Sequence, residues 1–174
     1  VSECGFMISI EEAKQRLIQL KEKSKFEKMV QVSAILTKLL EKYEIKPITV
    51  GGLAVEIYTR SEYTTSDIDM VFSRRDLANE VLLQLGFERE GRYWYHEELL
   101  ISIEIPNDML EDADINKVIE LNLKNGYKLY VIGIEDIILD RLRACVHWKS
   151  TADCEWGKRL LLIHHERLDI NPNF

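Results

Sequence analysis

The sequence predicts an α+β fold, in which a small mixed sheet is flanked by helices and both ends of the chain are helical. Three observations predict it. Apolar residues recur at helical spacing from Ile8 to about Tyr43. Short apolar runs, bounded by glycine, proline or asparagine in the manner of strands, occupy the middle of the chain. Helical spacing then returns from Ile134 to Leu168.

The same pattern predicts the domain organisation. A chain of 174 residues has the usual size of one domain. We therefore expect a single domain, 1-174, with N-terminal helices at 8-44, an α/β core at 45-132 and C-terminal helices at 134-168. The charged cluster Lys21–Lys25 is the expected joint between two amphipathic N-terminal helices.

The first part of the core is expected to run strand, glycine turn, short helix, loop, strand. Ile45–Val50 and Ile68–Phe72 have the composition of strands, and Ala54–Tyr58 can form one or two helical turns between them. Arg75–Leu85 has helical spacing, and Gly86 is the expected glycine at its C-terminal cap.

The rest of the core is expected to be β-structure. Four segments have the composition of strands: Arg92–Tyr95, Leu99–Ile105, Val118–Leu123 and Tyr127–Ile132. Pro106 ends the second of these, because proline cannot continue a hydrogen-bonded ladder. Asn125-Gly126 is a hairpin turn signal between the last two. Two helices, Ile134–Trp148 and Ala152–Leu168, are expected to close the chain.

Composition excludes several classes of protein. Hydrophobic residues make up 46% of the chain, and 8 Gly and 3 Pro are too few for a collagenous or low-complexity sequence. The net charge of -7 disfavours nucleic-acid binding driven by overall charge, although the basic segment Lys21–Lys28 leaves a local contact open. No apolar stretch approaches the roughly 20 residues that span a bilayer, and no secretory signal pattern is present. We expect a cytoplasmic protein without membrane contact.

The cysteines are expected to be reduced thiols. Cys4, Cys145 and Cys154 form an odd set without a CxxC pair, which argues against a disulfide framework and a zinc site.

Gly51-Gly52 is the first candidate for chemistry. The pair follows a predicted strand at the start of a helix, where the absence of Cβ atoms lets backbone N–H groups approach an anion closely. A phosphate group suits such a site. On its own the pair is more often a plain turn, so its neighbours in the sequence decide its meaning.

Asp67 and Asp69 are the second candidate. Two residues apart on a strand, they project from the same face, whereas Ile68 and Met70 project from the other. Two negative charges at such a short distance repel each other unless a cation neutralises them. A hard divalent ion such as Mg²⁺ prefers one or two carboxylates together with substrate phosphates. The pair therefore predicts a metal site.

Glu104 is the candidate third acid. In the strand Leu99–Ile105, the isoleucines point one way, so Ser102 and Glu104 point the other. If this strand lies beside Asp67–Phe72, Glu104 completes a cluster of three carboxylates that is able to hold two metal ions. A solvent-facing strand that alternates isoleucine with polar residues is the alternative interpretation.

Three motifs, taken in their order along the chain, resemble those of the minimal nucleotidyltransferases of the polymerase-beta-like superfamily. They are Val50-Gly51-Gly52, Asp67-Ile68-Asp69 and Glu104. The extended pattern is similar to a stand-alone bacterial and archaeal branch that includes abortive-infection toxins; it comprises Ala54, Tyr58, Arg60 and Thr65-Ser66. The sequence departs from the family at Ala152, which precedes Asp153 where a Lys or Arg is expected.

The resemblance implies the polymerase-beta-like nucleotidyltransferase fold and transfer of a nucleoside monophosphate from a nucleoside triphosphate to a hydroxyl acceptor. Mg²⁺ or Mn²⁺ is the implied cofactor. Asp67, Asp69 and Glu104 are the implied catalytic residues and metal ligands. The implied nucleotide-binding residues are Gly51, Gly52, Arg60, Thr65 and Ser66. From the residues alone, a role as ordinary loop residues is as well supported for Arg60 and Thr65 as a role in nucleotide binding.

Two functions stay open at this stage. The first is the metal-dependent enzyme, whose acceptor is RNA, a protein or a small molecule. The second is a non-catalytic nucleotide-binding protein, or one member of a toxin–antitoxin pair, with the same fold. Ala152 and the long N-terminal helical pattern favour the second function, which implies a partner protein or a second copy of the chain.

Overall fold

The computed structural model describes residues 6–60 and 63–168. Within these residues, one sheet carries the strands in the order β3-β4-β5-β2-β1-β7-β6. The strands are β1 Ile48–Val50, β2 Asp67–Val71, β3 Glu88–Glu90, β4 Tyr93–His96, β5 Ile101–Glu104, β6 Ile119–Asn122 and β7 Lys128–Val131. Strands β2 and β5 are parallel, as are β1 and β7, and the other neighbours are antiparallel. The sheet is therefore mixed, as the sequence predicts.

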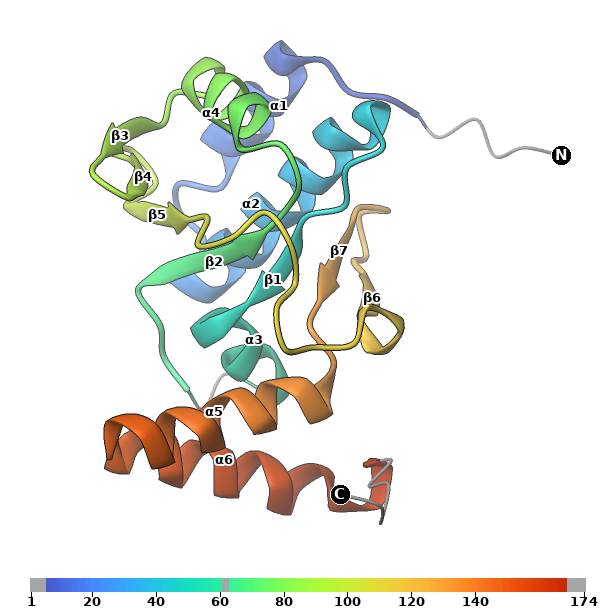
Figure 1. Ribbon diagram of the computed structural model, residues 1–174. Helices are drawn as coiled ribbons and strands as arrows, with labels where there is room; N and C mark the ends of the chain where they lie inside the picture. The colour runs from blue at the N-terminus through green and yellow to red at the C-terminus, as the bar shows by residue number, and fades with distance from the viewer. Residues whose placement is uncertain (1–5, 61–62, 169–174) are drawn as a thin grey trace, which may run out of the picture.

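Helices cover the sheet and form both ends of the described chain (Figure 1). The α-helices are α1 Ile10–Gln19, α2 Lys25–Leu40, α3 Gly51–Tyr58, α4 Arg75–Gln84, α5 Ile134–Trp148 and α6 Thr151–His164. Short 3₁₀ turns are η1 Glu41–Tyr43, η2 Ile115–Lys117 and η3 His165–Arg167. None of the described helices is long and apolar enough to cross a bilayer. The arrangement confirms the predicted α+β class.

The two N-terminal helices form because their sequences supply both caps and an apolar face. Ser9 and Glu12 make a capping box at the start of α1, and the Ser24 hydroxyl accepts the backbone N–H of Glu27 in α2. The predicted charged joint lies between these helices. Helix α2 is buried along most of its length and packs on β7, β2 and β5, so it forms the centre of the core.

Around the glycine pair, the structure corrects two boundaries. Helix α3 begins at Gly51 rather than near Ala54, so both glycines belong to its first turn. Strand β1 begins at Ile48, directly after Pro47, which has no N–H to donate to the sheet. Helix α4 ends as predicted, with Gly86 at φ +95° immediately after the cap residue.

The outer strands agree with the prediction in part. Strand β5 starts at Ile101 rather than Leu99, because Leu100 adopts φ +55° in the turn after β4. Strand β3 has no counterpart among the sequence predictions, since Glu88–Glu90 is polar and exposed and pairs along one side only. The Asn125-Gly126 hairpin joins β6 and β7 as expected.

Helices α5 and α6 lie side by side beyond α3 (Figure 1). Gly157 allows their close contact, because a Cβ there would lie 2.9 Å from a methyl group of Leu142. A disulfide joins Cys145 to Cys154, so the expectation of reduced thiols is wrong for this pair. The turn between the helices brings the two Cα atoms within 4.7 Å, a proximity that spacing along the sequence does not reveal. Cys4 lies outside the described residues.

Candidate functional site

Three carboxylates gather on one face of the sheet. Asp67 and Asp69 project from the same side of β2, and the intervening Ile68 is fully buried on the other. Strand β5 pairs directly with β2 in parallel, which places Glu104 opposite Asp69 and Ser102 opposite Asp67. The strand adjacency that the sequence analysis inferred is therefore present.

The electrostatics of Asp69 reflect this crowding. Burial, and after it the charges of Glu104 and Asp67, raise the pKa of Asp69 to about 6. The Arg141 guanidinium and a hydrogen bond from the backbone of Gly52 oppose the rise but do not cancel it. A carboxylate in this state gains from a nearby cation, because the cation removes the repulsion that raises its pKa.

The glycine pair sets α3 directly against Asp69. Gly51 has φ +60°, and a Cβ there would lie 2.2 Å from Oδ2 of Asp69. A Cβ at Gly52 would lie 2.5 Å from Oγ1 of Thr65. Val50, the N-cap residue, makes no side-chain capping hydrogen bond, and the backbone of Gly52 in the first turn hydrogen-bonds to Asp69 instead. Gly51 is thus needed for the close approach of the helix N-terminus to the Asp69 carboxylate, and Gly52 for its approach to Thr65.

The other predicted nucleotide-binding residues occupy different places. Arg60 is exposed at the far end of α3, nine residues from Gly51, which corresponds to about 13 Å along a helix axis. Ser66 is exposed immediately before β2. Thr65 is half-buried, and its hydroxyl donates to the carbonyl oxygen of Asp67 at 3.4 Å. The structure thus brings Thr65 and Ser66 beside the carboxylates but not Arg60.

A buried acid, Glu56, holds the loop that leads into β2. Its Oε2 accepts the backbone N–H of Thr65 at 3.3 Å, and burial raises the pKa of Glu56. The hydrogen bond from Thr65 lowers that pKa in turn. Sequence reasoning passed over Glu56, although a glutamate in the strongly apolar segment Leu53–Tyr58 is the kind of residue that needs a specific partner when buried.

Beside Asp69 lies a cavity of about 400 Å³. Its walls come from the start of α3, the ends of β1 and β2, the segment after β5 and the first half of α5; they include Gly51, Asp69, Asn107, Asp136 and Arg141. We call it the Asp69 cavity. It is large enough for a small ligand, and polar groups meet apolar walls in it.

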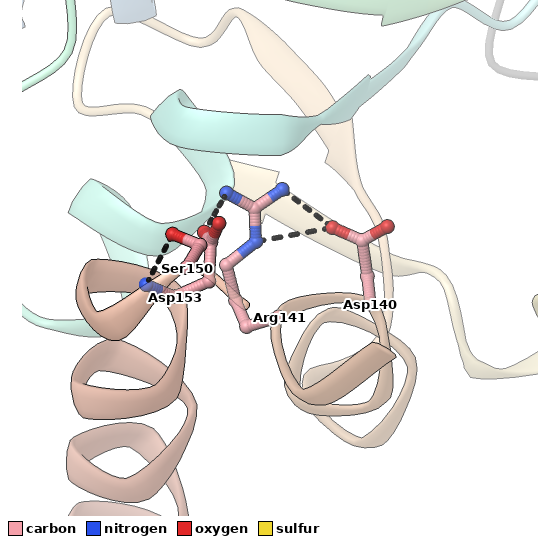
Figure 2. A network of polar contacts seen from close by, with 4 residues as sticks. All are labelled: Asp140, Arg141, Ser150 and Asp153. Atoms are coloured by element: carbon pink, nitrogen blue, oxygen red, sulfur yellow. Dashed lines mark hydrogen bonds and ion pairs between the residues drawn. The ribbon is translucent and has the colours of Figure 1, made fainter. Parts of the chain in front are cut away.

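Arg141 and Arg143 are the cations that line this cavity, and Arg141 is held by two carboxylates (Figure 2). Its guanidinium donates to Asp153 at 3.2 Å through Nη1 and to Asp140 at 3.1 Å through Nε, and its side chain is only 19% exposed. Asp153 belongs to α6, whose N-cap Ser150 accepts the Asp153 N–H. Figure 2 shows both carboxylates flanking the guanidinium, which fixes its position between the two helices.

Sequence analysis did not single out Arg141. Position 152, where the family pattern predicts a cation, holds an exposed alanine, and the cation near the carboxylates comes from α5 instead. One feature of the sequence was available: Arg141 follows Ile137 and Ile138 at helical spacing, so it interrupts an inward-facing apolar stripe.

Glu104 has a cation of its own. Nε of Arg92 lies 3.3 Å from Oε1 of Glu104, and the Arg92 guanidinium also lies over the ring of Tyr93. Within the described ranges, no three His, Cys, Asp or Glu side chains converge closely enough to hold a metal ion by themselves. The Asp67 and Asp69 pair nevertheless fits Mg²⁺, which takes one or two carboxylates and completes its octahedron with waters and substrate phosphates.

Comparison with known proteins supports the fold. No protein-family model matches the chain, and no curated protein matches it in sequence. Among solved structures, an antigenic nucleotidyltransferase-like protein from Paracoccidioides brasiliensis is similar, with 16% identity, a TM-score of 0.60 and coverage of 83% of this chain and 78% of that one. ANT(2'')-Ia in complex with adenylyl-2''-tobramycin is similar with 19% identity, a TM-score of 0.51 and coverage of 75% and 84%. The chain therefore has a nucleotidyltransferase-like fold, as its motifs imply.

Proposed function

We propose that the protein is a Mg²⁺-dependent nucleotidyltransferase that transfers a nucleoside monophosphate from a nucleoside triphosphate to a hydroxyl acceptor. The observation that carries the proposal is the parallel pairing of β2 with β5. It sets Glu104 opposite Asp69, with Asp67 on the same face, and the N-terminus of α3 meets Asp69. Acidic residues beside a helix N-terminus suit a ligand that brings both cations and phosphates.

The donor side of the site lies toward α3 and α5. The first turn of α3 at Gly51 and Gly52 would bind phosphate oxygens, and Arg141 and Arg143 bring positive charge to the α5 wall of the Asp69 cavity. Ser66 remains a predicted phosphate contact beside Asp67. Asp67 and Asp69 would hold Mg²⁺, or Mn²⁺ in its place, which when bound neutralises developing negative charge on the phosphates.

The transfer itself needs an acid–base partner and an in-line approach. The acceptor hydroxyl oxygen forms a bond to the α-phosphorus, and the bond from that phosphorus to the bridging oxygen of the β-phosphate breaks, so pyrophosphate leaves. The hydroxyl proton passes to Glu104 or Asp69, the two carboxylates that face each other across the strands.

The acceptor is a hydroxyl compound of a class that the donor site does not select. The complex of ANT(2'')-Ia with adenylyl-2''-tobramycin makes a small molecule one class to test for this chain, beside RNA and protein. The abortive-infection-like branch of the superfamily stays a prediction from the motif.

Calorimetry tests the donor site without an acceptor. Each nucleoside triphosphate is titrated into wild type with Mg²⁺ and with a chelator, and into an Asp67→Asn, Asp69→Asn double variant. Glu155→Gln is the control, because Glu155 is an exposed acid whose ion-pair partner is Arg159, and neither residue lines the site. We expect metal-dependent binding in wild type and the control, and none in the double variant. Equal metal-dependent binding in the double variant would remove the basis of the proposal.

A second candidate is a protein that binds nucleotide without turning it over and acts through a protein partner, as in a toxin–antitoxin pair. The observation in its favour is the exposed apolar end of α5, where Trp148 is 81% and Val146 is 72% exposed. Nucleotide binding in the calorimetry, followed by no pyrophosphate release with any acceptor class, would favour this function over transfer.

A further inference from the structure

A second hollow, of about 390 Å³, adjoins the Asp69 cavity at the end of β5, since Ile105 lines the hollow and Pro106 lines the cavity. We call it the arginine hollow. Its walls come from the start of α4 and the outer strands; they comprise Arg75, Arg89, Arg92, Trp94, Asn79, Asp76 and Ile105. Three guanidinium groups therefore surround one small space in a protein whose net charge is -7.

The positive charge of the hollow is poorly compensated. Asp76 is the one acid among the residues that line it, and its carboxylate pairs with Arg74 at 2.9 Å. The Arg75 guanidinium donates to the backbone carbonyl oxygens of Ile105 and Pro106, which carry no net charge. Within residues 6–60 and 63–168, neither Arg75 nor Arg89 forms an ion pair. An anion in the hollow would relieve the mutual repulsion of its arginines.

Arg89 is held in position with donors to spare. Its Nε donates to the carbonyl oxygen of Gly91 at 3.1 Å, and its guanidinium lies 5.7 Å from the ring centre of Trp94, a buried side chain. These contacts orient the fork while its two terminal amino groups have no hydrogen-bond partner among the described residues. Such an oriented fork binds two oxygens of a phosphate together.

The hollow adjoins the candidate acceptor side of the site. Arg92 belongs to its wall and also pairs with Glu104 at 3.3 Å. Ile105, another wall residue, directly follows Glu104, and Pro106 begins the segment that lines the Asp69 cavity. Cross-strand pairing puts Arg89 and Trp94 on the face of Ile103, opposite the carboxylates, so the hollow meets the site at the end of β5, where Arg92 contacts Glu104.

We propose that the arginine hollow binds a phosphate group of the acceptor, so that the acceptor is a phosphate-bearing molecule whose hydroxyl lies at Glu104. This inference rests on the proposed transfer, and it names the acceptor class that the donor site leaves open. The bound phosphate takes no part in bond making; it holds the acceptor. A phosphorylated small molecule and an RNA strand share this chemistry, whereas an unphosphorylated polyol or amine lacks it.

The test follows the Nε–Hε signals of arginine side chains by NMR while inorganic phosphate is added, without nucleotide or Mg²⁺. We expect the signals of Arg75 and Arg89 to shift and saturate, and the phosphate affinity to fall about tenfold in Arg89→Ala, the loss of one charge-assisted pair. Arg159→Ala is the matched control, because Arg159 likewise lies over a tryptophan, Trp156, at 4.8 Å but lines neither hollow. It should leave the affinity unchanged.

A titration in which phosphate moves neither Arg75 nor Arg89, or in which Arg89→Ala binds as tightly as Arg159→Ala, overturns the inference. The Asp67→Asn, Asp69→Asn variant separates this failure from failure of the proposed function, because it should keep the phosphate shifts while it loses metal-dependent nucleotide binding. Ribose 5-phosphate and a short single-stranded RNA then distinguish the sources. If RNA saturates the shift of the Arg89 signal at a lower concentration than ribose 5-phosphate does, the acceptor is a nucleic acid. Saturation at equal concentrations assigns a small phosphorylated acceptor.

Discussion

Gly51→Ala is the most discriminating single change in the candidate site. The new methyl group would lie 2.2 Å from Oδ2 of Asp69, so the carboxylate must withdraw by about 1 Å to reach an ordinary contact. The residue must also keep φ +60°, which costs a non-glycine residue about 1 kcal/mol. The substitution therefore has two effects, a local backbone strain and a displaced metal ligand.

Gly91→Ala separates these two effects. Gly91 has φ +62°, almost the same as Gly51, but no atom lies within 4 Å of the Cβ that it would carry. Both variants should lose about 1 kcal/mol of unfolding free energy from backbone strain, and Gly51→Ala should lose more from the overlap. Only Gly51→Ala should weaken metal-dependent nucleotide binding, by tenfold or more, since errors of about 1 Å in placed groups are costly.

The assay pairs urea unfolding with calorimetric titration of the nucleoside triphosphate that binds wild type best, in Mg²⁺. Binding is compared under conditions where both variants are folded. If Gly51→Ala binds nucleotide as tightly as Gly91→Ala does, the contact between the α3 N-terminus and Asp69 does not position the site, and the reasoning from the glycine pair is refuted.

Three further predictions concern charge and cross-linking. In metal-free protein the folded-state pKa of Asp69, about 6, exceeds its unfolded value, so stability should fall as pH rises from about 4 to 6. Asp69→Asn should flatten this pH dependence, measured by urea unfolding in the presence of a chelator. An unchanged slope of stability against pH in Asp69→Asn would contradict the prediction. Cys145→Ser with Cys154→Ser should lower stability by about 2–3 kcal/mol, and a reductant should do the same to wild type but not to the variant. Arg141→Gln should weaken nucleotide affinity about tenfold by calorimetry, and equal affinity in Arg141→Gln and Arg159→Gln would exclude a phosphate role.

Elements with strong local signals were predictable from the sequence. Helix α5 runs from Ile134 to Trp148 as expected, because its apolar periodicity is regular and it lies between Gly133 and the positive φ of Lys149. The β6 to β7 hairpin was also predictable from a local signal, because Asn125-Gly126 favours a tight turn. Strand β3 was not, because Glu88–Glu90 has no apolar alternation and pairs only where the chain turns back through Gly91.

For the site, predictability follows the distance along the chain between partners. The shared face of Asp67 and Asp69 depends only on the two-residue period of a strand, so the sequence contains it. The position of Glu104 opposite Asp69 depends on which strands pair, which the sequence analysis could only infer. The Cys145 to Cys154 disulfide depends on the turn that folds α6 back on α5, which a spacing of nine residues does not reveal.

The two arginines that flank the carboxylates are the least predictable part and carry the most functional meaning. Arg141 reaches the site from α5 on the donor side, and Arg92 reaches Glu104 from the turn before β4 on the other side. A cluster of carboxylates repels both a triphosphate and a phosphate-bearing acceptor, so each substrate needs a positive charge on its own side as well as the metal between them. Under the proposed function, Arg141 and Arg143 supply this charge on the donor side, and Arg92 supplies it beside Glu104 on the acceptor side.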